Sequence, residues 1–130
     1  MAYVLQFEKA GINVDSSFVH DNEAFHVQWM AENLGPDDAP DFVDRLVVTR
    51  RPEGCNGPEE QDEVVVFDSE SDADPADLAE PALPARFVGP AMSVRVGPFP
   101  VGAYRLTVTL DVGGDRPVTT LSCVDVAPAG

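Results

Sequence analysis

The sequence predicts an all-β sandwich, and the strongest reasons are two amphipathic segments that lie far apart in the chain. Around Trp29, the only tryptophan, apolar and polar side chains alternate from residue 24 to residue 34, which is the period of a strand with one buried face. Residues 103–112 show the same alternation, with Tyr104 on the apolar face. Turn-forming residues separate further short apolar segments. We therefore expect antiparallel strands that form a single domain over residues 1–130.

Seven strands account for the apolar segments along the chain. The first covers residues 3–8 and resumes at 11–14, and the others are expected at 24–34, 42–51, 63–67, 86–96 with a break at 89–90, 103–112 and 118–126. The glycine- and proline-rich segments 97–102 and 113–117 are the predicted turns between the last three. Seven short strands at this spacing are typical of a Greek-key sandwich.

Residues 68–84 are the longest interruption of the strand pattern. The segment begins as an acidic run, and Asp74 then precedes Pro75 as an N-cap residue precedes the first position of a helix. Pro81 stops any helix that begins there, so we expect at most one short helix near residues 75–80. Because the segment has no sustained apolar face, we expect a solvated loop that the fold can spare.

Size and composition fit one globular domain. A chain of 130 residues buries roughly two thirds of its unfolded surface, which suffices for a core without help from metals or disulfides. The hydrophobic content of 44% is ordinary for a globular protein and argues against a disordered acidic chain.

The charge of the chain is strongly negative. Aspartate and glutamate number 23 against 8 lysines and arginines, for a net charge of −15, and Lys9 is the only lysine. Such a surface repels nucleic acids and anionic membranes, so we exclude both as partners. Solubility, a coding bias toward arginine, adaptation to high salt and a cationic partner each explain the charge.

The sequence shows no targeting or membrane signal. No segment approaches the roughly 20 apolar residues of a membrane-spanning helix, so we expect no membrane insertion. The N-terminus has neither a basic leader nor a long apolar run, so no signal peptide is visible. Localisation therefore stays open: the protein remains inside the cell, leaves by another route, or has a leader outside this sequence. The cell surface and an assembled particle both fit.

Two cysteines occur in the chain. Cys55 lies in a loop rich in glycine and proline, and Cys123 lies in the last predicted strand. Their spacing matches no zinc motif. The pair forms either a disulfide that joins the loop to the last strand or two free thiols.

Motifs for catalysis are absent from the sequence. His20 and His26 are the only histidines, and neither lies in a pattern that pairs it with a nucleophile and a carboxylate. With 23 acids, a pair at the spacing of a glycoside hydrolase arises by chance, so acid pairs carry no signal. Glycine-rich phosphate loops and dinucleotide fingerprints are also missing. We therefore expect a protein that is not an enzyme and holds no cofactor.

One cation site is a candidate. Acidic residues alternate with small ones in residues 68–77, and calcium takes six to eight oxygen ligands from such segments. The candidate ligands are Asp68, Glu70, Asp72, Asp74 and Asp77. The run lacks the glycine and the distal bidentate glutamate of a calcium-binding loop, so a solvated loop is the alternative.

Two aromatic residues are expected to have structural roles. Trp29 shares its face with Phe25 and Val27, so we expect it in the core and not at a ligand site. Tyr104 follows Gly102 as in the tyrosine corner of Greek-key sandwiches, where the hydroxyl group bonds to nearby backbone.

The order of these elements is similar to that of a known family. A strand centred on Trp29 runs into Asn-Leu-Gly at 33–35, a strand led by phenylalanine follows at 42–48, and Pro-Val-Gly-Ala-Tyr-Arg-Leu-Thr-Val-Thr-Leu-Asp occupies 100–111. This arrangement resembles the bacterial and archaeal cell-adhesion-related domain (CARDB), an immunoglobulin-like sandwich akin to fibronectin type III. The resemblance covers about residues 3–126 and implies adhesion, surface display or assembly, with no catalytic motif to transfer.

The sequence thus favours a non-catalytic protein-interaction or structural module. One hypothesis is an adhesion-type or surface domain. A second is a small structural subunit of a larger assembly, such as a virion decoration or tail protein or a component of a contractile machine. A hydrolase built on a sandwich is the remaining alternative. The partner is either another protein or further copies of the chain, and the expected contact surfaces are the loops 36–41, 53–62 and 68–84, or an edge strand.

Overall fold

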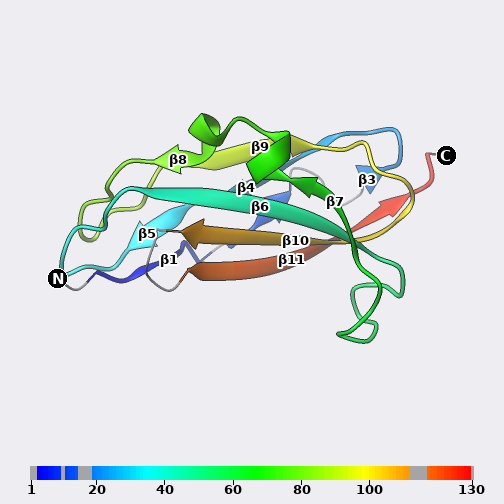
Figure 1. The fold of residues 1–130 in the computed structure, drawn as a ribbon, viewed down its shortest axis with the longest axis horizontal. Coiled ribbons are helices and arrows are strands. Elements are labelled where there is room, and N and C mark those ends of the chain that lie inside the picture. Colours follow the sequence, from blue (N-terminus) through cyan, green and yellow to red (C-terminus); the bar gives the residue numbers. More distant parts are fainter. Residues whose placement is uncertain (1–2, 10, 15–18, 112–116, 130) are drawn as a thin grey trace.

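The computed structural model describes residues 3–9, 11–14, 19–111 and 117–129. These residues form two layers of strands, and the two ends of the chain lie at opposite ends of the long axis (Figure 1). Of the turn predicted at 113–117, only Pro117 lies within the described residues.

One layer is a six-stranded sheet. Its strands follow the order β3 (Val19–His20), β11 (Val118–Ala127), β10 (Gly102–Asp111), β6 (Phe42–Arg51) and β7 (Val64–Asp68), while β8 (Ala79–Glu80) also pairs with β6. The pairing of β3 with β11 is parallel, and the other pairings in this sheet are antiparallel.

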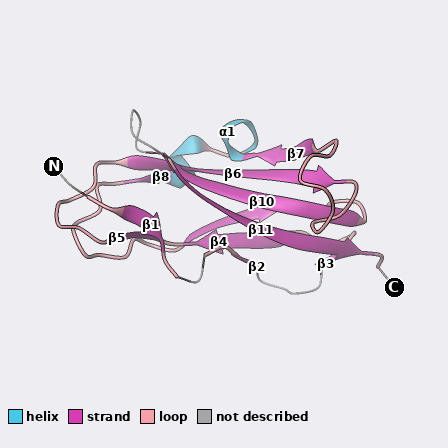
Figure 2. Cartoon of the chain, turned by 90° about the horizontal axis from the view of Figure 1, so that it is seen from below, coloured by secondary structure: helices cyan, strands magenta, loops and turns pink. Residues whose placement is uncertain are grey.

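The facing layer is smaller. It contains β2 (Asn13–Val14), β4 (Phe25–Trp29) and β9 (Met92–Val96), paired antiparallel in that order. A two-stranded sheet of β1 (Leu5–Phe7) and β5 (Ala31–Asn33) lies toward the N-terminal end of the molecule (Figure 2). The prediction of an all-β sandwich is confirmed.

The amphipathic segment around Trp29 forms two strands that join different sheets. β4 ends at Trp29, and β5 begins at Ala31 and pairs with β1. The predicted strand 86–96 is divided near the expected break at 89–90: a regular strand begins only at Met92, while Val88 makes an isolated bridge to Glu32. Both divisions occur where the chain passes from one small sheet to the other.

The core lies between the two layers, and the two aromatic residues singled out by the sequence are part of it. Trp29 is 2% exposed, which confirms its predicted burial. The hydroxyl group of Tyr104 donates a hydrogen bond of 2.6 Å to the carbonyl oxygen of Pro100, as in a tyrosine corner. The ring of Phe99 stacks on that of Tyr104 with 5.1 Å between centroids and meets Phe25 edge-on at 6.0 Å.

The Asn-Leu-Gly motif has a structural role. The side chain of Asn33 is buried; its Nδ2 donates to the carbonyl oxygens of Asp37, at 2.9 Å, and Leu83, at 3.0 Å. Its Oδ1 accepts a hydrogen bond of 2.9 Å from the backbone N–H of Gly35, which has a φ of +76° that favours glycine. Asn33 therefore holds three chain segments together at this end of the sandwich.

The segment 68–84 differs most from its prediction. The α-helix α1 (Ser69–Asp72) lies within the acidic run, and the 3-10 helix η1 (Pro75–Leu78) is the short helix predicted near 75–80. The hydroxyl oxygen of Ser69 accepts a hydrogen bond of 2.8 Å from the backbone N–H of Leu46, and Leu78 is buried in the core. Because α1, η1 and β8 cover the edge of β6 beyond β7, the expectation of a solvated, spare loop was wrong.

Candidate functional site

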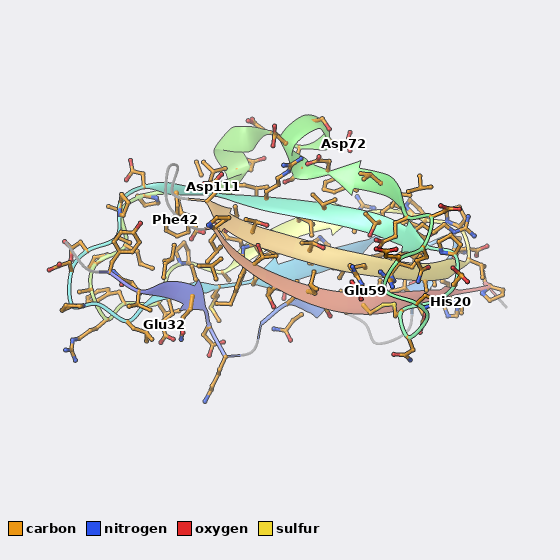
Figure 3. The ribbon with its side chains drawn as sticks, turned by 60° about the horizontal axis from the view of Figure 1, so that its bottom comes forward. His20, Glu32, Phe42, Glu59, Asp72 and Asp111 are labelled. Carbon is orange, nitrogen blue, oxygen red and sulfur yellow. A yellow bond between two sulfur atoms is a disulfide. The ribbon has the colours of Figure 1, made fainter. Side chains whose placement is uncertain are left out.

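The connection between β6 and β7, residues 52–63, projects from the sandwich near its C-terminal end (Figure 1). We call it the 52–63 loop. Glu59 of this loop lies toward the same end as His20, away from Glu32 and Phe42 (Figure 3). The loop contains the whole of one predicted contact surface, residues 53–62, and its backbone is held by a buried arginine, a glutamine and a disulfide.

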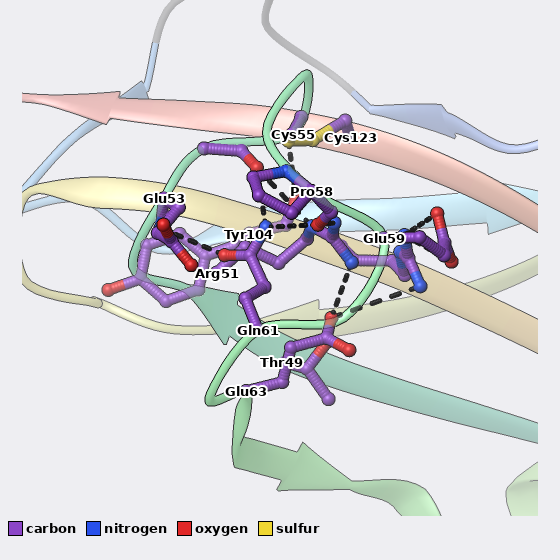
Figure 4. Close-up of a disulfide and its surroundings, with 12 residues drawn as sticks. Thr49, Arg51, Glu53, Cys55, Pro58, Glu59, Gln61, Glu63, Tyr104 and Cys123 are labelled. Atoms are coloured by element: carbon purple, nitrogen blue, oxygen red, sulfur yellow. Dashed lines mark hydrogen bonds and ion pairs between the residues drawn. A yellow bond between two sulfur atoms is a disulfide. The ribbon is translucent and has the colours of Figure 1, made fainter.

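A buried arginine at the end of β6 organises the loop. Arg51 is 2% exposed, although it belongs to the residue type that is most rarely buried without partners. Its Nη1 donates to Glu63 Oε1 at 3.0 Å, and its Nη2 donates to the carbonyl oxygen of Pro58 at 2.9 Å. Its Nε lies 3.4 Å from the carbonyl oxygen of Gly54. One guanidinium group thus contacts the beginning, the middle and the end of the loop (Figure 4).

A glutamine adds a second set of bonds across the loop. Gln61 Nε2 donates to the carbonyl oxygens of Gly54, at 3.1 Å, and Pro58, at 2.9 Å. Its Oε1 accepts a hydrogen bond of 2.8 Å from the backbone N–H of Glu53. A Cβ atom at Gly57 would overlap the carbonyl oxygen of Glu53, so the tight bend needs glycine there. The bonds and the glycine together define one shape for the loop.

A disulfide attaches the loop to the neighbouring sheet. Cys55 and Cys123 are joined, with their Cα atoms 6.4 Å apart, so the loop is bonded to β11 (Figure 4). Closing a chain over a sequence separation of 68 restricts the unfolded state and favours the folded one by about 4 kcal/mol in the chain-entropy model.

The 52–63 loop is acidic and faces few cations. Its acidic residues are Glu53, Glu59, Glu60, Asp62 and Glu63. Arg105 on β10 lies 3.2 Å from Glu59 and 3.9 Å from Glu63, and Glu63 also receives the hydrogen bond from Arg51. Glu60 and Asp62 are exposed. A fixed loop with surplus carboxylates can bind a cationic surface at little cost in ordering, because its backbone is already held.

A pair of buried acids lies in the core at the other end of β6. Asp44 is 1% exposed and Glu80 is 3% exposed. Trp29 Nε1 donates a hydrogen bond of 2.7 Å to Asp44 Oδ2. When both groups are ionised, Asp44 Oδ1 and both carboxylate oxygens of Glu80 have no donor within the described residues. A proton on Glu80 reduces this deficit, because the acid then donates to Asp44 and only one oxygen of Glu80 is left without a partner.

The pKa values of the two acids agree with a shared proton. Burial raises the pKa of Glu80 to about 9, and the hydrogen bond and negative charge of Asp44 add to the increase. Burial also raises the pKa of Asp44, while hydrogen bonds from Glu80 and Trp29 act in the opposite direction. At neutral pH, Glu80 is therefore the protonated member and Asp44 carries the negative charge. This arrangement is a core hydrogen-bond network in which Trp29 and the protonated Glu80 both donate to Asp44.

The five carboxylates predicted to bind calcium are not brought together as a set. Asp68 is the N-cap of α1 and lies 2.6 Å from Arg45, which holds the pKa of Asp68 below its usual range. Glu70 lies 3.2 Å from the same arginine, and Asp72 Oδ2 accepts a hydrogen bond from the backbone N–H of Asp68. Within the described residues, no group of three or more acids, histidines or cysteines could hold a metal ion.

The two histidines lie on strands of different sheets, His20 on β3 and His26 on β4. His20 Nδ1 lies 3.2 Å from the carbonyl oxygen of Pro128, and its Nε2 lies 3.9 Å from Glu23. His26 is paired in register with Arg95 of β9. Cys55 and Cys123 are bonded to each other, so neither is a free thiol.

Two hollows flank the outer face of β6 near Val43. One has a volume of about 520 Å³ and is lined by Asp41 and Glu80, and the other, of about 330 Å³, is lined by Arg45 and Thr109; both include Val43. They open beside the segment that covers the edge of β6.

Among the helices of the described residues, none is long and apolar enough to cross a membrane.

The fold and the fixed loop define an immunoglobulin-like β-sandwich with an acidic projection. Among solved structures, the CARDB domain of a Pyrococcus furiosus protein, in complex with di-metal ions, shares this fold with a TM-score of 0.61 and 16% sequence identity, over 98% of this chain and 96% of that domain. The predicted resemblance to a CARDB domain is confirmed at the level of the fold.

Longer proteins also contain this sandwich. A sporulation control protein from Bacillus subtilis matches with a TM-score of 0.69 and 9% identity, over 97% of this chain and 50% of that one. A Bacteroides uniformis beta-glucuronidase matches with a TM-score of 0.63 and 13% identity, over 93% of this chain but 14% of the enzyme. The chain therefore spans about half of the first protein and a small part of the second. No family model and no curated protein matches the sequence.

Proposed function

We propose that this chain is a non-catalytic, adhesion-type interaction module that binds a cationic protein through the 52–63 loop. The observation that carries the proposal is the fixing of this loop by Arg51, Gln61 and the disulfide, while Glu60 and Asp62 stay exposed at its surface. A surface that is ordered before binding loses little entropy on association, and its surplus negative charge selects cationic partners.

The structural likeness supports a module more than an enzyme. The CARDB domain matches this chain over nearly the full length of both, whereas the glucuronidase matches over only 14% of its own chain. This chain and the glucuronidase therefore share one sandwich domain and not a whole enzyme. In addition, both cysteines are bonded to each other in the disulfide, so neither supplies a thiol nucleophile to a hydrolase.

A structural subunit of a larger assembly is the second candidate, and a different surface favours it. At the end of the sandwich that carries β1 and β5, Val4, Leu34 and Phe87 are exposed, with Phe87 at 60%. The backbone N–H of Leu34 donates to the carbonyl oxygen of Val4, so these two side chains are neighbours. Exposed apolar side chains that gather at one end favour contacts between subunits. Sedimentation over a range of concentrations would detect such contacts, and Leu34→Ser should abolish them.

Charge neutralisation tests the proposed site. The loop variant is Glu60→Gln with Asp62→Asn, and the control is Glu23→Gln with Asp77→Asn, which removes the same charge from exposed positions elsewhere. The probe is a fluorescent peptide that alternates lysine and valine, with binding followed by anisotropy. The loop variant should bind about 3- to 10-fold more weakly, and the control less than about twofold more weakly, because each exposed charge contributes up to about 1 kcal/mol. An equal loss in both variants would show general attraction to the acidic protein and would remove the loop from the proposal.

A further inference from the structure

We infer that the outer edge of β7 receives an extended, lysine- or arginine-bearing segment of the partner as an additional strand of the sheet. This inference rests on the proposed function, because β7 begins where the 52–63 loop ends. It specifies the place and the manner in which a cationic partner binds.

The first step is the position of β7 in its sheet. β7 is the last strand in the order and pairs with β6 through residues from Val64 to Asp68. Among the described residues, no strand pairs with its other side, and both views show β7 at the margin of the sheet (Figures 1 and 2). A strand at an edge keeps a row of backbone N–H and C=O groups directed away from its neighbour, which can pair with an added strand.

The second step is the apolar character of this edge. Val64 and Val65 are 59% and 57% exposed, and because adjacent residues of a strand point to opposite faces, both faces of the edge offer apolar surface. Exposed edges are usually protected by lysine, proline or inward-pointing charge, and none of these occurs from Val64 to Phe67. A bulge is the one protective feature present: Val66 has no partner in β6.

The third step is the charge around the edge. Asp62 and Glu63 precede β7, and Asp68 and Glu70 follow its apolar part. On the β6 side, Arg45 pairs with Asp68 and Glu70, and Arg51 pairs with Glu63. Asp62 is exposed at the end of the edge where β7 begins. An added segment with an apolar centre and cationic flanks would match this pattern.

The same charges argue against a second copy of this chain as the occupant. Two copies of β7 paired antiparallel would bring Asp62 and Glu63 of one copy opposite Asp68 and Glu70 of the other. Each copy also has a formal net charge of −15. Like charges placed opposite each other across strands destabilise the pairing, so the charges favour a cationic segment over a second copy.

The test compares two lysine substitutions and two peptides. The peptide alternates lysine and valine over seven residues, and a second version has N-methyl groups on alternate backbone nitrogens, which removes hydrogen-bond donors without changing charge. Val65→Lys places a charge on the edge. Val43→Lys is the matched control, because it makes the same change at an exposed valine of a strand outside β7.

The wild-type protein should bind the unmodified peptide and gain amide hydrogen-exchange protection in residues 64–67. Val65→Lys and backbone methylation should each weaken binding about tenfold or more, and Val43→Lys by less than about twofold. The methylated peptide tests the wild-type protein directly, so the inference does not depend on the folding of a variant.

Each other outcome decides against the inference or against the proposed site. Equal binding of both peptides, equal loss in both lysine variants, or no binding at millimolar peptide would overturn strand addition. Protection of 64–67 that appears with protein concentration alone would assign the edge to a second copy. If Val65→Lys has no effect while Glu60→Gln with Asp62→Asn weakens binding, the 52–63 loop is the binding site and strand addition to β7 is rejected. If only Val65→Lys weakens binding, the peptide binds the edge of β7 and the loop is rejected as the site.

Discussion

Replacing Glu80 by glutamine is expected to stabilise the protein above pH 6, and to do so increasingly as the pH rises. In the folded protein, burial raises the pKa of Glu80 to about 9, compared with an ordinary value of 4.5. Between these two values, the folded state holds a proton that the unfolded state has lost. A glutamine carries an amide donor at all pH values, so the variant keeps a bond to Asp44 without binding a proton.

The magnitude follows from proton linkage. A group whose folded pKa is raised contributes stability that is fully present below its unfolded pKa and is lost as the pH rises to the folded pKa. One proton corresponds to about 1.4 kcal/mol per pH unit in the free energy of unfolding. The wild-type protein should therefore lose roughly 3 kcal/mol relative to Glu80→Gln between pH 6 and pH 8. Because Asp44 and Glu80 share one proton, the titration belongs to the pair.

Urea denaturation at pH 6, 7 and 8, followed by the fluorescence of Trp29, measures this difference. Asp77→Asn is the control, because Asp77 is exposed and its removal should leave the pH dependence of the wild-type protein unchanged. Parallel stability curves for the wild-type protein and Glu80→Gln would refute the shared proton. A variant that is less stable than the wild-type protein at pH 8 would show that the amide does not fit beside Asp44.

Three further predictions concern other parts of the fold. Ser69→Ala should lower the free energy of unfolding by about 1–3 kcal/mol, because it leaves the backbone N–H of Leu46 without an acceptor; Ser71→Ala, at an exposed position, should cost less than about 0.5 kcal/mol in the same urea experiment. Replacing Cys55 and Cys123 by serine should cost about 4 kcal/mol by the same measurement, and no change in stability would show that the bond adds nothing. Calcium at millimolar concentration should leave the melting temperature unchanged, because the acidic run faces an arginine and does not converge on a common point; a clear increase would restore the calcium hypothesis.

The period of two predicted more of the fold than any motif did. It placed Trp29 and Tyr104 in the core, while the apolar segment 42–51 gave both ends of β6 correctly. The same period could also have identified Asp44, which falls on the apolar face between Phe42 and Leu46. An acid in that phase predicts a buried carboxylate that needs a donor, and the sequence analysis did not use this signal.

Other members of the site could not be predicted from local pattern. Glu80 belongs to a strand of two residues beside Pro81, too short for any period to be visible. The burial of Arg51 depends on the conformation of the whole 52–63 loop, which sequence composition does not specify. The acidic run was misread because its counter-charge, Arg45, comes from another strand.

The disulfide also determines how the protein would respond to tension. The two ends of the chain lie at opposite ends of the long axis (Figure 1), so a load applied through them runs along the strands. A force strong enough to unravel the sandwich could not extend the segment between Cys55 and Cys123, because a covalent bond bypasses it. The sequence separation is 68, and an extended residue spans about 3.4 Å, so the disulfide shortens the extended chain by roughly 230 Å. Single-molecule stretching should therefore give a contour length shorter by about this amount in the oxidised protein than in the reduced one. A module attached at both ends would then stay short under load, with its acidic loop still bonded to the last strand.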